Sequence, residues 1–317
     1  MHVKLKQEIQ ALYEKYKNDR SGEVNKSIPA LSQVNADSFA ISVAMANGKV
    51  IEVGDVNTNF TIQSISKPFI YGLALEQYGS EFVERKVGIE PTGEDFDTVI
   101  KLDDQGRPFN PMVNSGAIAI TSLVNADSKK TREEEVLGCL SNYAGKKLRV
   151  HSPTFKSEKE SGDKNYAIAH LLKHFQILGK DLKQDLELYF KQCSANVTST
   201  DLAMMGATLA NNGVNPLTKK QCVSPENLRH ILSIILTCGM YNYSGEWVFD
   251  IGLPAKSGVS GGILMVVPGL MAISVYSPRL DKRGNSIRGI KVCEELSKKY
   301  NLHILDTSSP KKASEIL

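Results

Sequence analysis

The sequence lacks a strong excess of charge of either sign. Its 317 residues include 38 lysines and arginines against 35 aspartates and glutamates, which gives a formal net charge of +3. A domain that binds a phosphate backbone usually carries a basic stripe, whereas these charges are spread along the chain. With 41% hydrophobic and 23% charged residues, the composition is typical of a globular protein with a substantial core. We therefore expect neither nucleic-acid binding nor wholesale disorder.

Long hydrophobic runs are also missing. The longest nearly apolar segment, residues 263–276, is interrupted by Pro268 and Gly269 and is too short to cross a bilayer as a helix. The first nine residues carry charges where a signal peptide would need an apolar stretch. These two observations predict a cytoplasmic protein with no membrane partner.

Cysteines are few, and their spacing forms no recognisable framework. The five of them are odd in number and include no C-x-x-C pair: Cys139, Cys193, Cys222, Cys238 and Cys293. This pattern predicts reduced thiols without disulfides or a zinc site. His170 and His174 stand four residues apart on an expected helix, but no third ligand accompanies them. We therefore expect no metal centre.

Apolar spacing and turn residues outline the secondary structure. Helical spacing predicts an N-terminal helix over residues 3–18. Residues 39–45 and 50–53 are predicted strands, and Asn47-Gly48 between them favours a type I′ hairpin turn. The remaining predicted elements are strands at residues 247–251, 263–267 and 270–276, a turn at Pro268-Gly269, and a helix over about 285–300.

The order of these elements predicts an α+β fold. Two strands come early and three come late, around a long middle, roughly residues 64–240, with helical spacing. Such an order favours one antiparallel sheet formed by both chain ends, with a helical lobe inserted between them. A cleft between two lobes is a common place for a small-molecule site.

The segment Ser-Ile-Ser-Lys-Pro at residues 64–68 is the first candidate for chemistry. A serine becomes a nucleophile when a base takes its proton, and a lysine with a lowered pKa can be that base. Pro68 belongs in the first turn of a helix, so it puts Ser64 at or beside a helix N-terminus, where free N–H groups can stabilise an oxyanion. The spacing is weak alone, because it recurs at Ser161 and Lys164. A helix cap with a solvated Lys67 is the simpler interpretation of this element by itself.

The second candidate is the glycine-rich segment at residues 256–262, which begins Lys256-Ser257-Gly258 and precedes a predicted strand. An upstream Ser-x-x-Lys with a later Lys-Ser-Gly is the arrangement of serine acyl-transfer enzymes of the penicillin-recognising type. The glycines let the backbone approach a substrate, and an N–H of an edge strand can complete an oxyanion hole. A plain glycine-rich turn is the alternative for this segment.

Six sequence blocks, in order, resemble the serine-dependent glutaminase family. They are residues 63–68, 109–117, 157–165, 188–194, 238–241 and 254–259, and the resemblance extends over roughly residues 27–295. It implies a fold like that of β-lactamases and penicillin-binding proteins. It also implies hydrolysis of L-glutamine to L-glutamate and ammonia, without metal or organic cofactor, by a homodimer or homotetramer.

The resemblance also implies roles for single residues. Ser64 would be the nucleophile and Lys67 its activator, with the backbone N–H groups of Ser64 and Val259 holding the oxyanion. The substrate-contacting positions would be Asn114, Glu158, Asn165, Tyr189 and Tyr241. A carboxylate is needed for the ammonium group of a free amino acid, and Glu158 suits that task. Either Tyr189 or Tyr241 would also relay a proton, and Tyr241 is our choice.

Residue 27 departs from the family pattern. The family usually has Tyr-Ile-Pro in the N-terminal loop, with the tyrosine reaching the substrate, whereas this chain has Ser27-Ile28-Pro29. A serine cannot reach as far as a phenol, and a lost neutral hydrogen bond costs about 0.5–1.5 kcal/mol. We expect an active enzyme with weakened glutamine binding.

The expected organisation is one glutaminase domain with short additions at both ends. An N-terminal helix would occupy residues 1–24 and pack on the body, the domain residues 25–305, and a flexible tail residues 306–317. Within the domain, the sheet lobe would comprise about 25–63 and 245–305, and the helical lobe about 64–244.

Two rival functions stay open at this point. A β-lactamase or D-alanyl peptidase shares the Ser-x-x-Lys and Lys-Ser-Gly elements, but such enzymes act outside the cytoplasm. A glutamine-sensing or scaffold protein could have kept the fold and lost catalysis. Ser27 is the only support for that second rival, and the intact set of Ser64, Lys67 and Tyr241 speaks against it.

Overall fold

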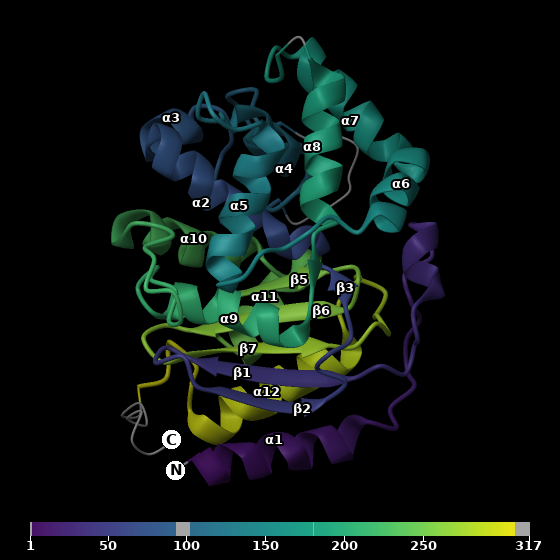
Figure 1. Ribbon diagram of the computed structural model, residues 1–317, viewed down its shortest axis with the longest axis vertical. Helices are drawn as coiled ribbons and strands as arrows, with labels where there is room; N and C mark the ends of the chain where they lie inside the picture. Colours follow the sequence, from purple (N-terminus) through teal and green to yellow (C-terminus); the bar gives the residue numbers. More distant parts are fainter. Residues whose placement is uncertain (1, 93–101, 180, 308–317) are drawn as a thin grey trace.

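A five-stranded antiparallel sheet forms one half of the molecule. The computed structural model describes residues 2–92, 102–179 and 181–307. The strands lie in the order β2-β1-β7-β6-β5 (Figure 1). Their bounds are β1 Ala40–Met45, β2 Val50–Gly54, β5 Ala255–Gly258, β6 Gly262–Val267 and β7 Met271–Tyr276. Both ends of the chain therefore build the sheet, as the sequence predicts.

The hairpin between β1 and β2 is confirmed, but its predicted turn type is wrong. A type I′ turn needs positive φ at both central residues. Gly48 has a φ of 88°, whereas Asn47 is not in the left-handed region. The loop is longer than two residues, since the Met45 N–H donates to the Lys49 carbonyl and Ala44 pairs with Val50. One glycine in the left-handed region is enough to reverse the chain in such a loop.

The predicted strand at residues 247–251 is wrong, because this segment belongs to helix α11 (Ser244–Asp250). Trp247 and Ile251, four residues apart, are both fully buried, while Phe249 between them is exposed. This is one turn of helical periodicity, which a short run of aromatic and branched residues does not reveal. The strand that fills its place is β5, which contains the Lys-Ser-Gly segment that the sequence placed just before a predicted strand, with a glycine-rich turn as the alternative.

Helices cover both faces of the sheet. On one face lie α1 (His2–Tyr16) and α12 (Ile287–Tyr300), and on the other lies α9 (Ser199–Ala210) (Figure 1). The helix predicted at residues 3–18 and the one predicted at about 285–300 are thereby confirmed. Gly206 of α9 permits its close approach to the sheet, because a Cβ there would lie 2.5 Å from the side chains of Ala272 and Leu264. The sheet is thus the middle layer of three.

The long middle of the chain is helical, as predicted, and forms a lobe above the sheet in Figure 1. Most of its helices pack around α2, α4 and α8. Their bounds are α2 Lys67–Tyr78, α3 Ser80–Glu84, α4 Asn114–Leu123, α5 Arg132–Ala144, α6 Ser152–Ser161, α7 Asp163–His174, α8 Leu182–Cys193 and α10 Pro225–Cys238. Short 3₁₀ helices lie at η1 Pro29–Gln33, η2 Gln63–Ser66 and η3 Tyr241–Tyr243, and a small second sheet pairs β3 Phe60–Thr61 with β4 Asn196–Val197.

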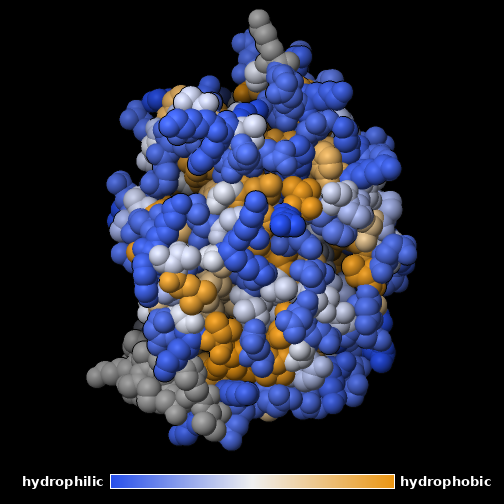
Figure 2. Space-filling model, viewed as in Figure 1, coloured by the Kyte–Doolittle hydropathy of each residue, from blue (hydrophilic) through white to orange (hydrophobic). Residues whose placement is uncertain are grey.

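The face of the molecule seen in Figure 2 is mostly hydrophilic, with apolar patches between the polar side chains. In the described parts of the chain, no helix is both long enough and apolar enough to cross a membrane. The flexible tail predicted for residues 306–317 falls, from residue 308 onward, outside the described residues.

Candidate active site

The junction of η2 and α2 presents Ser64 at the start of a helix. Lys67 is the first residue of α2, and Pro68 lies in its first turn, where a missing N–H costs nothing. Ser64 precedes it in η2, so the predicted position beside the helix N-terminus is confirmed. The Ser66 hydroxyl steadies this turn by donating to the Gln63 carbonyl at 2.8 Å. The chain turns here from β3 through η2 into α2, and the Ser64 side chain faces the cavity between the lobes.

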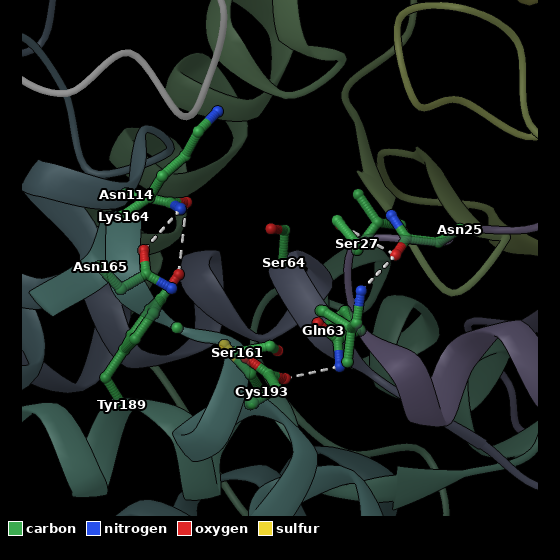
Figure 3. Close-up of a pocket in the computed structure, with 14 residues that line it drawn as sticks. Asn25, Ser27, Gln63, Ser64, Asn114, Ser161, Lys164, Asn165, Tyr189 and Cys193 are labelled. Atoms are coloured by element: carbon green, nitrogen blue, oxygen red, sulfur yellow. Dashed lines mark hydrogen bonds between the residues drawn. The ribbon is translucent and has the colours of Figure 1, made fainter.

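Ser64 opens into a cavity of about 170 Å³ between the two lobes. Figure 3 shows Ser64 near its middle, with Asn114, Asn165 and Tyr189 on one side and Gln63 on the other. Six predicted site residues line this cavity together: Ser64, Asn114, Glu158, Asn165, Tyr189 and Val259. Lys67 and Tyr241, the other two, do not line it.

Lys67 is buried directly behind the cavity. Its amino group donates to the Met112 carbonyl at 2.9 Å and to Asn114 Oδ1 at 2.7 Å. Burial disfavours the charged form and lowers the pKa of Lys67 to about 8. A lysine with this pKa supplies a neutral amine close to physiological pH, which a base beside a serine requires.

Asn114 joins Lys67 to the cavity. Its Oδ1 accepts hydrogen bonds from Lys67 and from the Tyr189 hydroxyl, the latter at 3.3 Å. Its amide nitrogen donates to Asn165 Oδ1 at 3.0 Å. Side chains from α2, α4, α7 and α8 are thereby held in one network. Because each amide is oriented by its partners, the cavity wall presents fixed donors and acceptors.

Glu158 of α6 is a buried carboxyl group that faces the cavity. Gln63 Nε2 donates to its Oε1 at 2.8 Å and to the Thr61 hydroxyl at 3.1 Å. Burial raises the pKa of Glu158 to about 7, although Gln63 and the charge of Lys67 lower it in part. A bound cation would favour the ionised form, so Glu158 is suited to receive an ammonium group.

The two tyrosines have different partners. The Tyr241 hydroxyl donates to the Ser257 carbonyl at 3.1 Å, and a hydrogen bond with Ser64 also acts on it. Burial nevertheless holds the pKa of Tyr241 well above its usual value, so the phenol stays protonated. The Tyr189 hydroxyl donates to Asn114 instead. Of the two, Tyr241 is therefore the one whose pKa a hydrogen bond with Ser64 lowers in part.

Two backbone N–H groups at the cavity have no acceptor among the residues that the structure describes. They are those of Ser64, at the η2 turn, and of Val259, which directly follows the edge strand β5. Gly258 allows β5 to lie close to η2, because a Cβ there would lie 3.0 Å from Ile65 and 3.1 Å from the Ile62 carbonyl. Unpaired N–H groups at one site are what an oxyanion hole needs.

The cavity also contains residues that the sequence did not single out. Gln63 is buried, has a left-handed φ of 51° and orients Glu158. Cys193, at the end of α8, contributes a buried thiol whose pKa is raised by burial. Both lie inside sequence blocks that carry the family resemblance, and this position in the blocks is the signal that could have marked them as site residues. Lys164, inside another of these blocks, also lines the cavity, as does Asn25, which nothing in its sequence context marked.

Ser27 lines the cavity from the N-terminal loop and is exposed. Its hydroxyl donates to Asn25 Oδ1 at 3.0 Å, and the Ile28 N–H donates to the same oxygen. The short side chain is thus engaged within its own loop. Every predicted site residue thus lies in or directly behind one cavity.

Comparison with known proteins identifies the family. A family model described as Glutaminase matches residues 22–305. A curated glutaminase from Nostoc sp. is 50% identical over 298 residues, which cover 94% of this chain and 89% of that protein. The chain belongs to the glutaminase family. The enzyme class expected from the sequence is confirmed with it.

Solved glutaminase structures share the fold. A probable glutaminase, ybaS, superimposes with a TM-score of 0.92 at 38% identity, over 96% of this chain and 99% of that one. A probable glutaminase from Bacillus subtilis, complexed with 6-diazo-5-oxo-L-norleucine, has a TM-score of 0.86 at 34% identity, over 94% and 96% of the two chains. The predicted α+β, β-lactamase-like fold is thereby confirmed.

Proposed function

We propose that this glutaminase hydrolyses L-glutamine to L-glutamate and ammonia through a γ-glutamyl ester on Ser64. One observation carries the proposal. Ser64 shares a single cavity with a buried carboxyl group, an oriented amide network and two backbone N–H groups that have no described acceptor. These are the partners that an ammonium group, an amino-acid carboxylate and a developing oxyanion require.

Glutamine would bind through its charged end first. Glu158 takes the α-ammonium group, which restores the ionised form of its carboxyl. The amide nitrogens of Asn114 and Asn165 and the hydroxyl of Tyr189 supply donors for the α-carboxylate. The side-chain amide then reaches Ser64, with its carbonyl oxygen toward the N–H groups of Ser64 and Val259.

Acylation needs one proton to travel from Ser64 to the leaving nitrogen. The neutral amine of Lys67 accepts the Ser64 proton as the hydroxyl oxygen attacks the γ-carbon, and the oxyanion is held by the two N–H groups. The Tyr241 phenol donates its proton to the nitrogen and is reprotonated from Lys67. The C–N bond then breaks, ammonia leaves, and the γ-glutamyl ester remains.

Deacylation repeats the steps with water. Lys67 takes a proton from the water that attacks the ester, and the bond to Ser64 Oγ breaks. The proton returns to Ser64, and L-glutamate departs with the enzyme in its starting state. The hydrogen bond between Tyr241 and Ser64, together with the contact of Tyr189 to Asn114, supports Tyr241 as the relay.

Ammonia release from L-glutamine tests this proposal directly. The purified protein is assayed beside Ser64→Ala, with L-asparagine as the shorter substrate. We expect release from glutamine that depends on Ser64, while the variant keeps its fold and melting temperature. Appreciable turnover by Ser64→Ala would defeat the serine mechanism. Binding of glutamine without any ammonia release would instead establish a sensing protein, and acylation by a β-lactam would favour the penicillin-recognising class.

A homodimer or homotetramer in the cytoplasm is the assembly and location that we propose for this enzyme. The family resemblance supports the oligomer. Light scattering on the full chain at micromolar concentration measures the assembly. A monomeric mass that persists in the active preparation would contradict it.

A further inference from the structure

Asn25 is a cavity residue to which the proposed mechanism gives no task. It lies in the N-terminal loop and lines the cavity together with Ser27. Figure 3 shows these two residues across the cavity from Asn114 and Asn165, with Ser64 between the two sides. A polar side chain in such a place either supports its own loop or reaches the substrate. The hydrogen bonds of Asn25 separate these two tasks.

The oxygen of the Asn25 amide supports the loop. Asn25 Oδ1 accepts from the Ser27 hydroxyl and from the Ile28 N–H, both at 3.0 Å. A backbone N–H can only donate, so the bond from Ile28 fixes which end of the amide is the oxygen. The nitrogen end therefore faces away from that N–H, and it has no acceptor among the residues that the structure describes.

The other amide on this side of the cavity has no donor to spare. Gln63 Nε2 gives its two N–H groups to Glu158 Oε1, at 2.8 Å, and to the Thr61 hydroxyl, at 3.1 Å. Gln63 thus serves the carboxyl group that is proposed to take the substrate ammonium. Of these two amides, Asn25 is the one with N–H groups left to offer to an anion.

The loop holds Asn25 in a fixed place. On its N-terminal side, Glu23 and Leu280 exchange two backbone hydrogen bonds, at 3.2 and 2.9 Å. On its C-terminal side, the Ala30 N–H donates to the Ser157 hydroxyl of α6 at 3.1 Å. A donor that is held in position before its ligand arrives loses little conformational entropy on binding, so more of the energy of its hydrogen bond appears as affinity.

We propose that Asn25 is a substrate-binding residue whose amide nitrogen donates to the α-carboxylate of glutamine. The inference rests on the proposed function and adds a contact to it. A carboxylate has two oxygens with about four acceptor positions, and the donors of the helical lobe approach it from one side. Asn25 serves the oxygen that faces the N-terminal loop, so the carboxylate is held between the two sides of the cavity.

Three variants test this role: Asn25→Ala, Asn25→Asp and Lys26→Gln. Each is assayed beside the wild type for kcat and KM by ammonia release from L-glutamine, with thermal unfolding as a check on the fold. Asn25→Asp keeps an oxygen for the Ser27 hydroxyl and the Ile28 N–H, so the loop retains its support. It replaces the donor, however, with a negative charge.

Both changes at Asn25 should weaken binding and spare turnover. We expect Asn25→Ala to raise KM by about tenfold, with kcat within about twofold of wild type, because a hydrogen bond to a charged group is lost. Asn25→Asp is expected to raise KM by about tenfold more, since the new charge repels the α-carboxylate. A fall in KM in Asn25→Asp would place the residue at the ammonium group, and a wild-type KM would leave it with the loop alone. Either result would overturn the proposal.

Lys26→Gln is the matched control. It changes the charge of the loop by the same amount as Asn25→Asp, but Lys26 is exposed, pairs with Glu23 and is not among the residues that line the cavity. We expect its kcat and KM to stay within about twofold of wild type, because an exposed ion pair contributes little. A KM increase as large as that of Asn25→Asp would assign the effect to the charge of the loop and overturn the proposal.

The remaining outcomes separate this inference from the proposed function. Ammonia release that depends on Ser64, with unchanged KM in both Asn25 variants, would overturn the role of Asn25 alone, as would a loss in kcat at constant KM. No ammonia release by the wild-type protein would overturn the proposed function, and this inference with it. If Asn25→Ala does not fold, because the Ile28 N–H loses its acceptor, the sign of the KM change in Asn25→Asp decides. Failure of both variants to fold would make Asn25 a structural residue and overturn the proposal.

Discussion

The two walls of the active site are built in different ways. The wall from the helical lobe carries Asn114, Glu158, Asn165 and Tyr189, which are side chains on separate helices that orient one another or the cavity. The wall from the sheet lobe works mainly through its backbone, with the N–H that follows β5 and the carbonyl of Ser257. Side chains suit the recognition of a particular small molecule, whereas a strand edge holds N–H groups rigidly for charge that develops during reaction. We therefore expect changes on the helical wall to affect KM, and changes at the junction with the sheet to affect kcat.

Replacement of Lys67, the proposed base, should give the largest effect. Lys67→Met keeps the length of the buried stem and removes the amine. We expect kcat to fall by about 10²–10⁴-fold, because the Ser64 proton loses its acceptor. Steady-state ammonia release measures the effect, and thermal unfolding serves as control, since Asn114 loses a donor. A kcat within tenfold of wild type would mean that another group is the base.

Loss of the Glu158 carboxylate on the helical wall should raise KM and leave kcat largely unchanged. Glu158→Gln keeps the shape of the side chain, but it removes the charge that we propose pairs with the substrate ammonium. A hydrogen bond to a charged group is worth about 1.5–3 kcal/mol, which corresponds to a KM increase of about 10- to 150-fold. A loss of the same size in kcat, with KM unchanged, would show that the helical wall does not act mainly through substrate binding.

The pH dependence of kcat/KM should reflect the titration of one group on each side of the site, Glu158 and Lys67. The pKa of Glu158 is raised to about 7, so acidification below pH 7 protonates it and weakens binding of the ammonium group. The pKa of Lys67 is lowered to about 8, so the neutral amine becomes dominant above pH 8. Both effects predict that kcat/KM rises from pH 6 to pH 8.5, by about tenfold for each pH unit below an essential pKa. A flat profile across this range would exclude both groups as the titrating pair.

The smallest effect is expected at the exposed N-terminal loop that lines the cavity. Ser27→Tyr introduces a phenol that can reach the substrate, and one neutral hydrogen bond is worth about 0.5–1.5 kcal/mol, or about 2- to 12-fold in kcat/KM. Ser27→Phe is the matched control, because it adds the ring without the hydroxyl. If both variants gain equally, the benefit comes from the ring, and if neither gains, our account of the departure at residue 27 is wrong.

The fold could be predicted wherever one local signal dominated. Asn47-Gly48 marked the first hairpin and Pro268-Gly269 the last, and the four strands β1, β2, β6 and β7 followed. The signal failed at Trp247, where a short apolar run fits a helix as well as a strand. It failed again at β5, because Lys256 and Ser257 are polar and glycine follows them, although the structure buries both residues inside the sheet.

The site could be predicted as a set of residues, but its geometry could not. The order of the sequence blocks named the residues that line the cavity together with Ser64. Nothing local indicated that Gln63 orients Glu158, which is 95 positions further along the chain. Glu158 also stands in a charged stretch that would ordinarily be solvated, yet it is buried. The choice of Tyr241 over Tyr189 likewise gains its support from contacts that only packing creates.

The sequence by itself determined the features that depend on a few neighbouring residues. These are the positions of the hairpin turns, the periodicity of the terminal helices, and the junction at which Pro68, in the first turn of α2, places a helix start shortly after Ser64. Only the tertiary structure decided the state of the chemical groups. Burial sets the lowered pKa of Lys67 and the raised pKa of Glu158, and β5 brings Lys256 beneath Tyr241. Desolvation and hydrogen-bond partners come from segments far apart in the chain, so these properties arise only when the two lobes pack together.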